Sequence, residues 1–101
     1  MSYMENSQHG GSTNVADVTM EYNDGGVYTG KMLPGVKHGM GVMKYKTGET
    51  YEGMYKDGLR DGKGTFTNTD GSFYKGAWKE GKQEGHGIFQ FPNGDKYTGA
   101  W

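Results

Sequence analysis

The chain has 101 residues, a formal net charge of −1 and no cysteine. This length allows one small domain, and the lack of cysteine excludes disulfides and thiolate metal sites. The near-neutral charge removes bulk electrostatic attraction to nucleic acids or anionic membranes. Aliphatic residues are few, whereas aromatic residues make up 14% of the chain and include eight tyrosines. Since each aromatic ring buries about 150–250 Å², the composition favours a thin aromatic core over a thick two-layer one.

The N-terminal segment, residues 1–16, is polar, contains the pair Gly10-Gly11 and shows no hydrophobic periodicity. Such a composition is typical of a disordered leader. The segment does not have the pattern of a signal peptide, and no apolar run approaches the ~18 residues of a membrane span. We therefore expect a cytoplasmic protein whose folded part comprises residues 17–101.

A first hairpin is expected around the Asn/Asp-Gly turn at residues 23–26. Val18, Met20 and Tyr22 alternate with polar residues before this turn, and the alternation resumes after it at Tyr28. Alternation on both sides of such a turn is the strongest short-range signal of a β-hairpin.

The same arrangement returns with a period of 23 residues. Tyr28, Tyr51, Tyr74 and Tyr97 mark it, and a glycine follows each of them two positions later. Full copies of the unit occupy residues 28–50, 51–73 and 74–96, with half copies at each end. A fixed period of this size indicates a repeat array in which each unit buries its apolar face by stacking on its neighbours. We expect four hairpins, that is eight short strands, joined by glycine-rich loops such as residues 56–62.

The pleat of a strand puts residues two apart on the same face. In the second strand of each hairpin a tyrosine, a glycine and a large side chain follow one another at this spacing, as in Tyr74, Gly76 and Trp78. The residues between them are polar. The expected fold is all-β: an elongated single-layer antiparallel sheet of consecutive β-hairpins, with one aromatic face and one polar face. Asn68 interrupts the apolar pattern of its strand, so its hairpin is expected to pack least well.

Three motifs that could carry chemistry fail on their spacing. Residues 58–63 lack the glycine spacing of a phosphate loop, and neither Ser, Thr nor a helix follows the lysine. Residues 68–71 resemble the middle of a calcium loop, but Phe66 and Ala77 occupy two ligand positions. The three histidines share no metal-ligand spacing, and no nucleophile, base and orienting group come together. We expect no enzymatic activity, no cofactor and no metal site.

Residues 51–64 and 74–87 resemble the MORN (membrane occupation and recognition nexus) repeat, whose pattern is Y-x-G-x-W-x-x-G-x-x-x-G-x-G with a period near 23. The resemblance covers residues 18–101. Met32 replaces the aromatic residue of the first copy, and Leu33-Pro34 stands where a charged pair is usual.

Proteins with such repeats are mostly scaffolds of cytoskeletal, ciliary or flagellar assemblies, the axoneme included. The resemblance implies a non-enzymatic scaffold of this kind that binds a protein partner, or a second copy of itself, along its aromatic face. The expected contact residues are Tyr28, Tyr51, Tyr55, Phe66, Tyr74, Trp78, Phe89, Tyr97 and Trp101. The alternative is a peripheral phosphoinositide- or membrane-binding module. For that role Lys37, His38 and Lys44 form the one local positive cluster, and we expect membrane contact to be weak.

Trp78 belongs to the best-formed copy and is expected to face Phe89 and Tyr97 on neighbouring strands. A large ring there could stabilise the array, fill a pocket of a partner, or both. The last strand, around Tyr97, is expected to be an edge with unpaired backbone groups. Such an edge invites a partner or a second copy of the chain.

Overall fold

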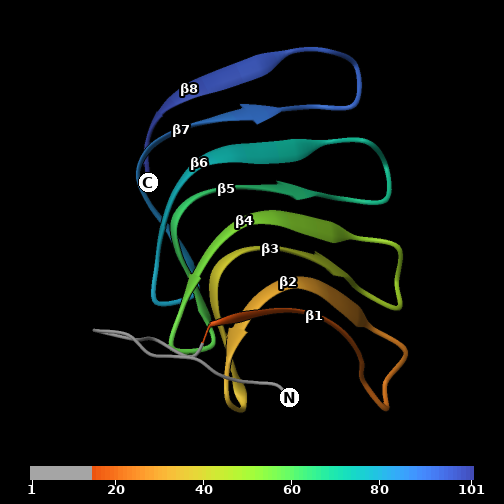
Figure 1. Cartoon of the computed structure of the whole chain (residues 1–101). Helices are drawn as coiled ribbons and strands as arrows, with labels where there is room; N and C mark the ends of the chain where they lie inside the picture. The colour runs from red at the N-terminus through yellow and green to blue at the C-terminus, as the bar shows by residue number, and fades with distance from the viewer. Residues whose placement is uncertain (1–14) are drawn as a thin grey trace.

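The computed structural model of the chain describes residues 15–101, and every regular element in that range is a strand. The strands are β1 (Ala16–Glu21), β2 (Val27–Leu33), β3 (Val36–Lys44), β4 (Thr50–Lys56), β5 (Leu59–Thr67), β6 (Phe73–Lys79), β7 (Lys82–Gln90) and β8 (Lys96–Ala100). They form one antiparallel sheet in chain order (Figure 1). The predicted all-β array of four hairpins is confirmed. No helix in the described range is long and apolar enough to cross a membrane.

The first strand begins at Ala16, which pairs with Met32 of β2. The sheet therefore starts one residue before the predicted boundary at residue 17. The predicted disordered leader otherwise lies outside the described residues.

Three-residue loops close the four hairpins. In the first of these loops the amide of Gly25 donates to the carbonyl of Tyr22 at 2.9 Å, and Gly25 has a φ of +96°. A type I turn followed by a left-handed residue is a common hairpin connection, and glycine adopts that last position without steric cost. The amide of Tyr22 also donates to the carbonyl of Gly26 at 2.8 Å, and the same pair of bonds recurs in the loops that begin at Tyr45, Asn68 and Phe91.

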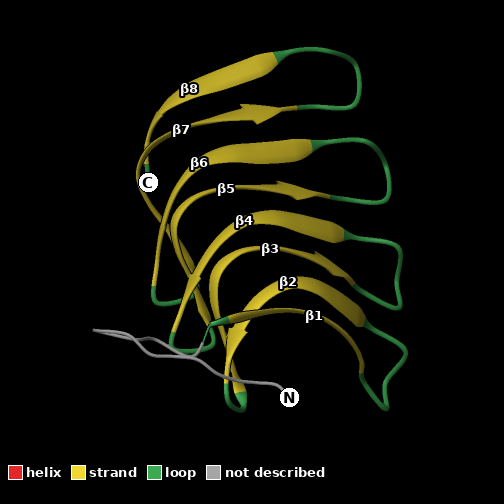
Figure 2. Ribbon diagram, viewed as in Figure 1, coloured by secondary structure: helices red, strands yellow, loops and turns green. Residues whose placement is uncertain are grey.

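Two-residue turns join one hairpin to the next after β4 and β6. Asp57 and Gly58 have φ values of +52° and +87°, as a type I′ turn requires. The prediction of a long glycine-rich loop at residues 56–62 is wrong, because residues 59–62 already belong to β5. Figure 2 shows these tight turns at one end of the arched strands and the three-residue loops at the other.

A row of glycines crosses the sheet from β2 to β8. Its members, paired from strand to strand, are Gly30, Gly41, Gly53, Gly64, Gly76, Gly87 and Gly99. A Cβ added to Gly53 would collide with the Cα of Gly64, so the backbones approach here more closely than a side chain allows. The register shifts beside Gly30, Gly53 and Gly76, and such bulges bend strands. The glycine row is therefore the line along which the sheet bends.

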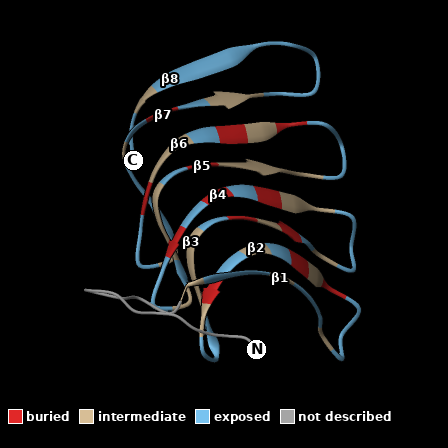
Figure 3. Cartoon of the chain, in the orientation of Figure 1, coloured by how far each residue is buried: buried red, intermediate tan, exposed pale blue. Residues whose placement is uncertain are grey.

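The bend brings residues of the same strand together over the aromatic face. The ring centroids of Tyr51 and Tyr55 are 5.2 Å apart, although residues four apart in a flat strand are separated by about 13 Å. The buried apolar residues are Tyr28, Met32, Met43, Tyr51, Tyr55, Tyr74 and Trp78. They lie in β2, β3, β4 and β6, whereas β8 is largely exposed (Figure 3).

Candidate functional site

Seven rings form a continuous zigzag along the aromatic face, which we name the aromatic spine. In order of contact they are Tyr28, Tyr55, Tyr51, Trp78, Tyr74, Trp101 and Tyr97. Successive centroids lie 4.7 to 5.4 Å apart with interplanar angles of 73 to 90°, an edge-to-face geometry. The four repeat tyrosines share one face, as predicted. Each is separated from the next by the large ring of the following copy.

The hydroxyl groups of the spine tyrosines bond across the bend. Tyr51 donates to the carbonyl of Met54 at 2.9 Å, and Tyr28 and Tyr74 make the same bond in their own copies. Burial raises the pKa of Tyr51 to about 12 from an ordinary value of 10.0, and it also raises the pKa values of Tyr28 and Tyr74. These phenols therefore remain neutral hydrogen-bond donors at any physiological pH.

The predicted contact residues differ widely in exposure. Tyr28, Tyr51 and Tyr74 expose at most 1% of their surface, and Tyr55 and Trp78 expose 5%. In this conformation these five rings offer almost no surface to a partner, because neighbouring repeats cover them. The prediction of partner contact therefore does not fit them; they are core residues. The other four predicted residues are more open: Phe66 and Phe89 are partly buried, Tyr97 is 51% exposed and Trp101 is 40% exposed.

The predicted direction of Trp78 is wrong. Its nearest rings are Tyr74 at 5.3 Å, Tyr51 at 5.4 Å and Phe66 at 6.3 Å, rather than Phe89 and Tyr97. The indole Nε1 donates to the carbonyl of Gly64 at 3.1 Å, which turns the ring back over the preceding strand. Trp78 thus fastens its own copy to the copy before it.

Two basic side chains lie over the spine at equivalent positions of successive copies. Lys37 Nζ is 4.8, 5.5 and 5.7 Å from the ring centroids of Tyr22, Tyr28 and Tyr55. We call this arrangement the first cation site. These distances are those of cation–π attraction.

The second cation site holds Arg60, 23 residues further along. The guanidinium carbon lies 4.8 to 5.7 Å from four ring centroids, those of Tyr45, Tyr51, Phe66 and Trp78. Its Nη2 also donates to the hydroxyl of Tyr45 at 2.5 Å. The carbonyls of Lys37 and Arg60 both accept a turn glycine amide of the next copy at 2.9 Å, so the two backbones are held alike. The sequence reasoning missed this pair, although their equal offset from the repeat tyrosines signalled it.

The predicted positive cluster of Lys37, His38 and Lys44 does not form as one patch. Lys37 lies over the aromatic rings, whereas His38 accepts the amide of Asp57 at its Nδ1, 3.4 Å away. Neighbouring residues of a strand point to opposite faces, which separates the first two members.

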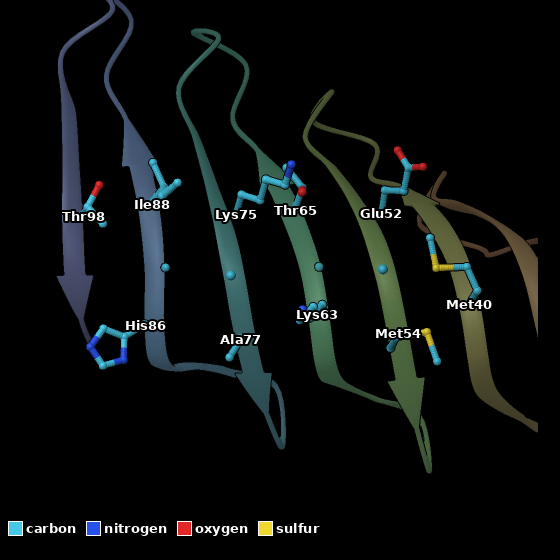
Figure 4. A pocket seen from close by; sticks show the side chains of 14 residues that line it. Met40, Glu52, Met54, Lys63, Thr65, Lys75, Ala77, His86, Ile88 and Thr98 are labelled. Carbon is cyan, nitrogen blue, oxygen red and sulfur yellow. The ribbon is translucent and has the colours of Figure 1, made fainter.

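The face opposite the spine carries a hollow of about 830 Å³, which we name the outer trough. Backbone of the glycine row forms its floor, and two rows of side chains border it (Figure 4). Met40, Met54 and Ile88 are exposed along it, and Lys63 and Lys75 stand among them. The expected polar face is therefore partly apolar. In the sequence, Met40, Met54 and Ile88 each stand directly beside a glycine of the glycine row, and this pattern indicated apolar side chains on the second face.

Residues 15–101 hold no group of three or more His, Cys, Asp or Glu that could bind a metal ion.

The bent sheet and the aromatic spine define an open array of β-hairpin repeats whose rings interlock from one copy to the next. A family model for the MORN repeat matches residues 28–50, 51–73 and 74–96, and the chain belongs to the MORN-repeat family. A comparison with curated proteins found no match. Repeats of this family are non-catalytic modules that interact with proteins or membranes.

Proposed function

We propose that the chain is a non-enzymatic scaffold that binds a segment of a protein partner at the C-terminal end of its aromatic face. The observation that carries this proposal is a group of exposed rings on this face. Tyr97 is half exposed, and Trp101, whose ring centroid lies 5.2 Å from it, is 40% exposed. Phe91 is also exposed and packs on Phe89 at 4.8 Å. Clustered exposed rings of this kind are typical of binding sites, where aromatic side chains contribute much of the affinity.

A hollow of about 470 Å³ adjoins these rings on the same face. Phe66, Tyr74, Phe89 and Trp101 are among the residues that line it. Polar side chains, among them Arg60 and Gln83, complete its lining. Hollows of a few hundred Å³ that combine aromatic and polar groups accept side chains or small ligands. We infer that one side chain of the partner segment enters this hollow, while the adjacent residues of the segment cover Tyr97.

As the setting we propose a cytoplasmic assembly of the cytoskeleton, a cilium or a flagellum, which rests on the family resemblance alone.

Site-specific photo-crosslinking in the native cell tests the binding face. A photoreactive phenylalanine analogue replaces Tyr97 in one variant and Ile88, on the outer trough, in the matched control. We expect a protein crosslink from position 97 that the control does not give. Crosslinks from position 88 alone would overturn the proposal.

A second candidate function, binding to an anionic membrane, is favoured by one observation. Lys63 and Lys75 stand beside the apolar Met54 and Ile88 on the outer trough. Flotation with phosphoinositide-containing vesicles tests it, with the double variant Lys63→Glu/Lys75→Glu as the comparison. The main proposal expects no flotation of either protein at physiological salt. Strong flotation of the wild type that the double variant loses would favour the membrane function instead.

A further inference from the structure

The third copy repeats the architecture of the cation sites but lacks the basic residue. In sheet register Lys37 lies opposite Met32, Arg60 lies opposite Tyr55 and Gln83 lies opposite Trp78. Gln83 therefore occupies the position of the two cations, and its carboxamide carries no charge. Among residues 15–101, no basic group lies over the rings of Tyr74, Phe89 or Trp101.

Most of the rings that would surround a cation are present in the third copy, which we call the third site; the residues around the cation are the walls of a site. A shift of 23 residues carries the walls of the second site, Tyr45, Tyr51, Phe66 and Trp78, onto Asn68, Tyr74, Phe89 and Trp101. The ring centroids of Tyr74 and Trp101 are 4.7 Å apart with an interplanar angle of 73°, the edge-to-face geometry of the other pairs in the spine. Three of these four positions are thus aromatic, as around Arg60. The Phe89 ring packs on Phe91 at 4.8 Å, whereas Phe66 of the second site packs on Trp78 at 6.3 Å.

The position of the missing cation is open. The hollow of about 470 Å³ on this face is lined by all four walls of the third site together with Gln83. Asn68 does not close it, because its amide donates to Ser72 Oγ at 2.9 Å, within its own turn. The equivalent hollow of the second site is smaller, about 280 Å³, and Arg60 and Tyr45 are among the residues that line it. The Arg60 guanidinium bonds to the Tyr45 hydroxyl there.

We propose that the third site binds an arginine or lysine side chain of a protein partner, in the place that Arg60 has in the second site. This inference rests on the proposed function, since it names the chemistry of the partner segment on the same face. Ring faces carry negative electrostatic potential and attract a cation, and the hollow adds the room that such a side chain needs.

Arg60 and Lys82 also line the hollow, and their charges oppose an incoming cation. The molecule already shows that this opposition is tolerated. Lys37 lies over the ring of Tyr55 and Arg60 lies over the ring of Tyr51. These two rings are in contact, so two cations already occupy adjacent sites one copy apart. The open side of the hollow faces solvent, where salt screens charges beyond about 8 Å at physiological ionic strength.

The test is an NMR titration of the ¹⁵N-labelled full chain with two capped tripeptides. One is acetyl-Gly-Arg-Gly-amide, and the other carries citrulline, which has the shape of arginine without its charge. We expect a saturable shift of the Trp101 indole N–H with the arginine peptide, and binding at least about threefold weaker with citrulline. Equal responses to the two peptides, or no saturable response, would overturn the proposal.

The variant Gln83→Arg supplies the missing cation from within the chain. We expect it to raise the thermal midpoint and to abolish the response of Trp101 to the arginine peptide. The matched control Gln90→Arg adds the same charge to the same strand next to Phe89, on the opposite face, and keeps the response. A folded Gln83→Arg protein that still binds the peptide would contradict the inference.

These outcomes separate this inference from the proposed function. A protein crosslink from position 97 without a response to arginine overturns the cation site alone. A response to arginine without a protein crosslink overturns the proposed scaffold function alone.

Discussion

Tyr51 of β4 lies over Gly64 of β5 so closely that a Cβ at position 64 would collide with its hydroxyl and ring. Equivalent contacts join Tyr28 to Gly41 and Tyr74 to Gly87. The repeat tyrosine and the glycine of the next strand are therefore one packing unit. The glycine makes room for the ring, and the ring covers the line along which the sheet bends.

Gly64→Ala should destabilise the array by about 1–3 kcal/mol, because the added methyl group overpacks a buried ring. Backbone strain is not the cause, since Gly64 is not among the glycines with positive φ. Denaturant unfolding followed by tyrosine fluorescence or circular dichroism measures the loss. The neighbouring Thr65→Ala, on the outer trough, should cost less than about 1 kcal/mol. Equal losses in the two variants would contradict this account.

Trp78→Ala should cost about 3–5 kcal/mol, because it removes a buried ring that contacts Tyr51 and Tyr74 and a hydrogen bond to the carbonyl of Gly64. Trp101→Ala is the matched control at the end of the same spine. Since Trp101 is partly exposed, its removal should cost clearly less. Urea midpoints of the two variants decide the matter. If Trp101→Ala lowered the stability as much as Trp78→Ala, the half-exposed ring would contribute as much to the stability of the fold as the buried one, which contradicts the prediction.

Stability should fall as the pH rises from about 10 to 12. Burial raises the pKa of Tyr51 in the folded chain to about 12, above its ordinary 10.0. Below pH 10 the phenol is protonated in both states, so its contribution is fully present there. Between the two values the unfolded chain releases a proton that the folded chain retains, and the contribution is lost progressively. Unfolding midpoints measured across this range, together with tyrosinate absorbance, test the prediction.

The variant Tyr51→Phe separates titration from packing. It retains the ring but loses the hydrogen bond to Met54, which should cost about 0.5–1.5 kcal/mol at neutral pH. Its loss of stability above pH 10 should be shallower than in the wild type. An unchanged alkaline profile would show that other groups control it.

Arg60→Met should cost about 1–2 kcal/mol, because methionine keeps much of the apolar volume but loses the charge over four rings and the bond to Tyr45. Lys82→Met, on an exposed neighbouring strand position, is the matched control and should change stability by no more than about 0.5 kcal/mol. Thermal unfolding of both variants checks the difference. If Arg60→Met were as stable as the control, the second cation site would contribute nothing to the fold.

The repeat, the four hairpins and the common face of the tyrosines could be predicted from the sequence, because each depends on local rules. Turn chemistry marks the hairpin at residues 23–26, and the two-residue pleat puts Tyr74 and Trp78 on one face. The length of the turn at Asp57 and Gly58 could not be predicted as easily. Both a long loop and a type I′ turn accommodate those residues, and pairing with β4 selects the second.

Tertiary structure alone decided which rings are core and which are surface. Tyr51 and Tyr97 hold the same position in the repeat, yet one is buried and the other is half exposed. Tyr51 lies between the rings of Tyr55 and Trp78, whereas Tyr97 contacts the ring of Trp101. The cation sites, likewise, are assembled from strands of two or three successive copies. Arg60 meets Tyr45 and Trp78 only because the bent sheet brings the start of the loop after β3 together with β5 and β6 over one spine. Periodicity along a chain specifies which residues are equivalent, whereas contacts across strands determine what each equivalent residue touches.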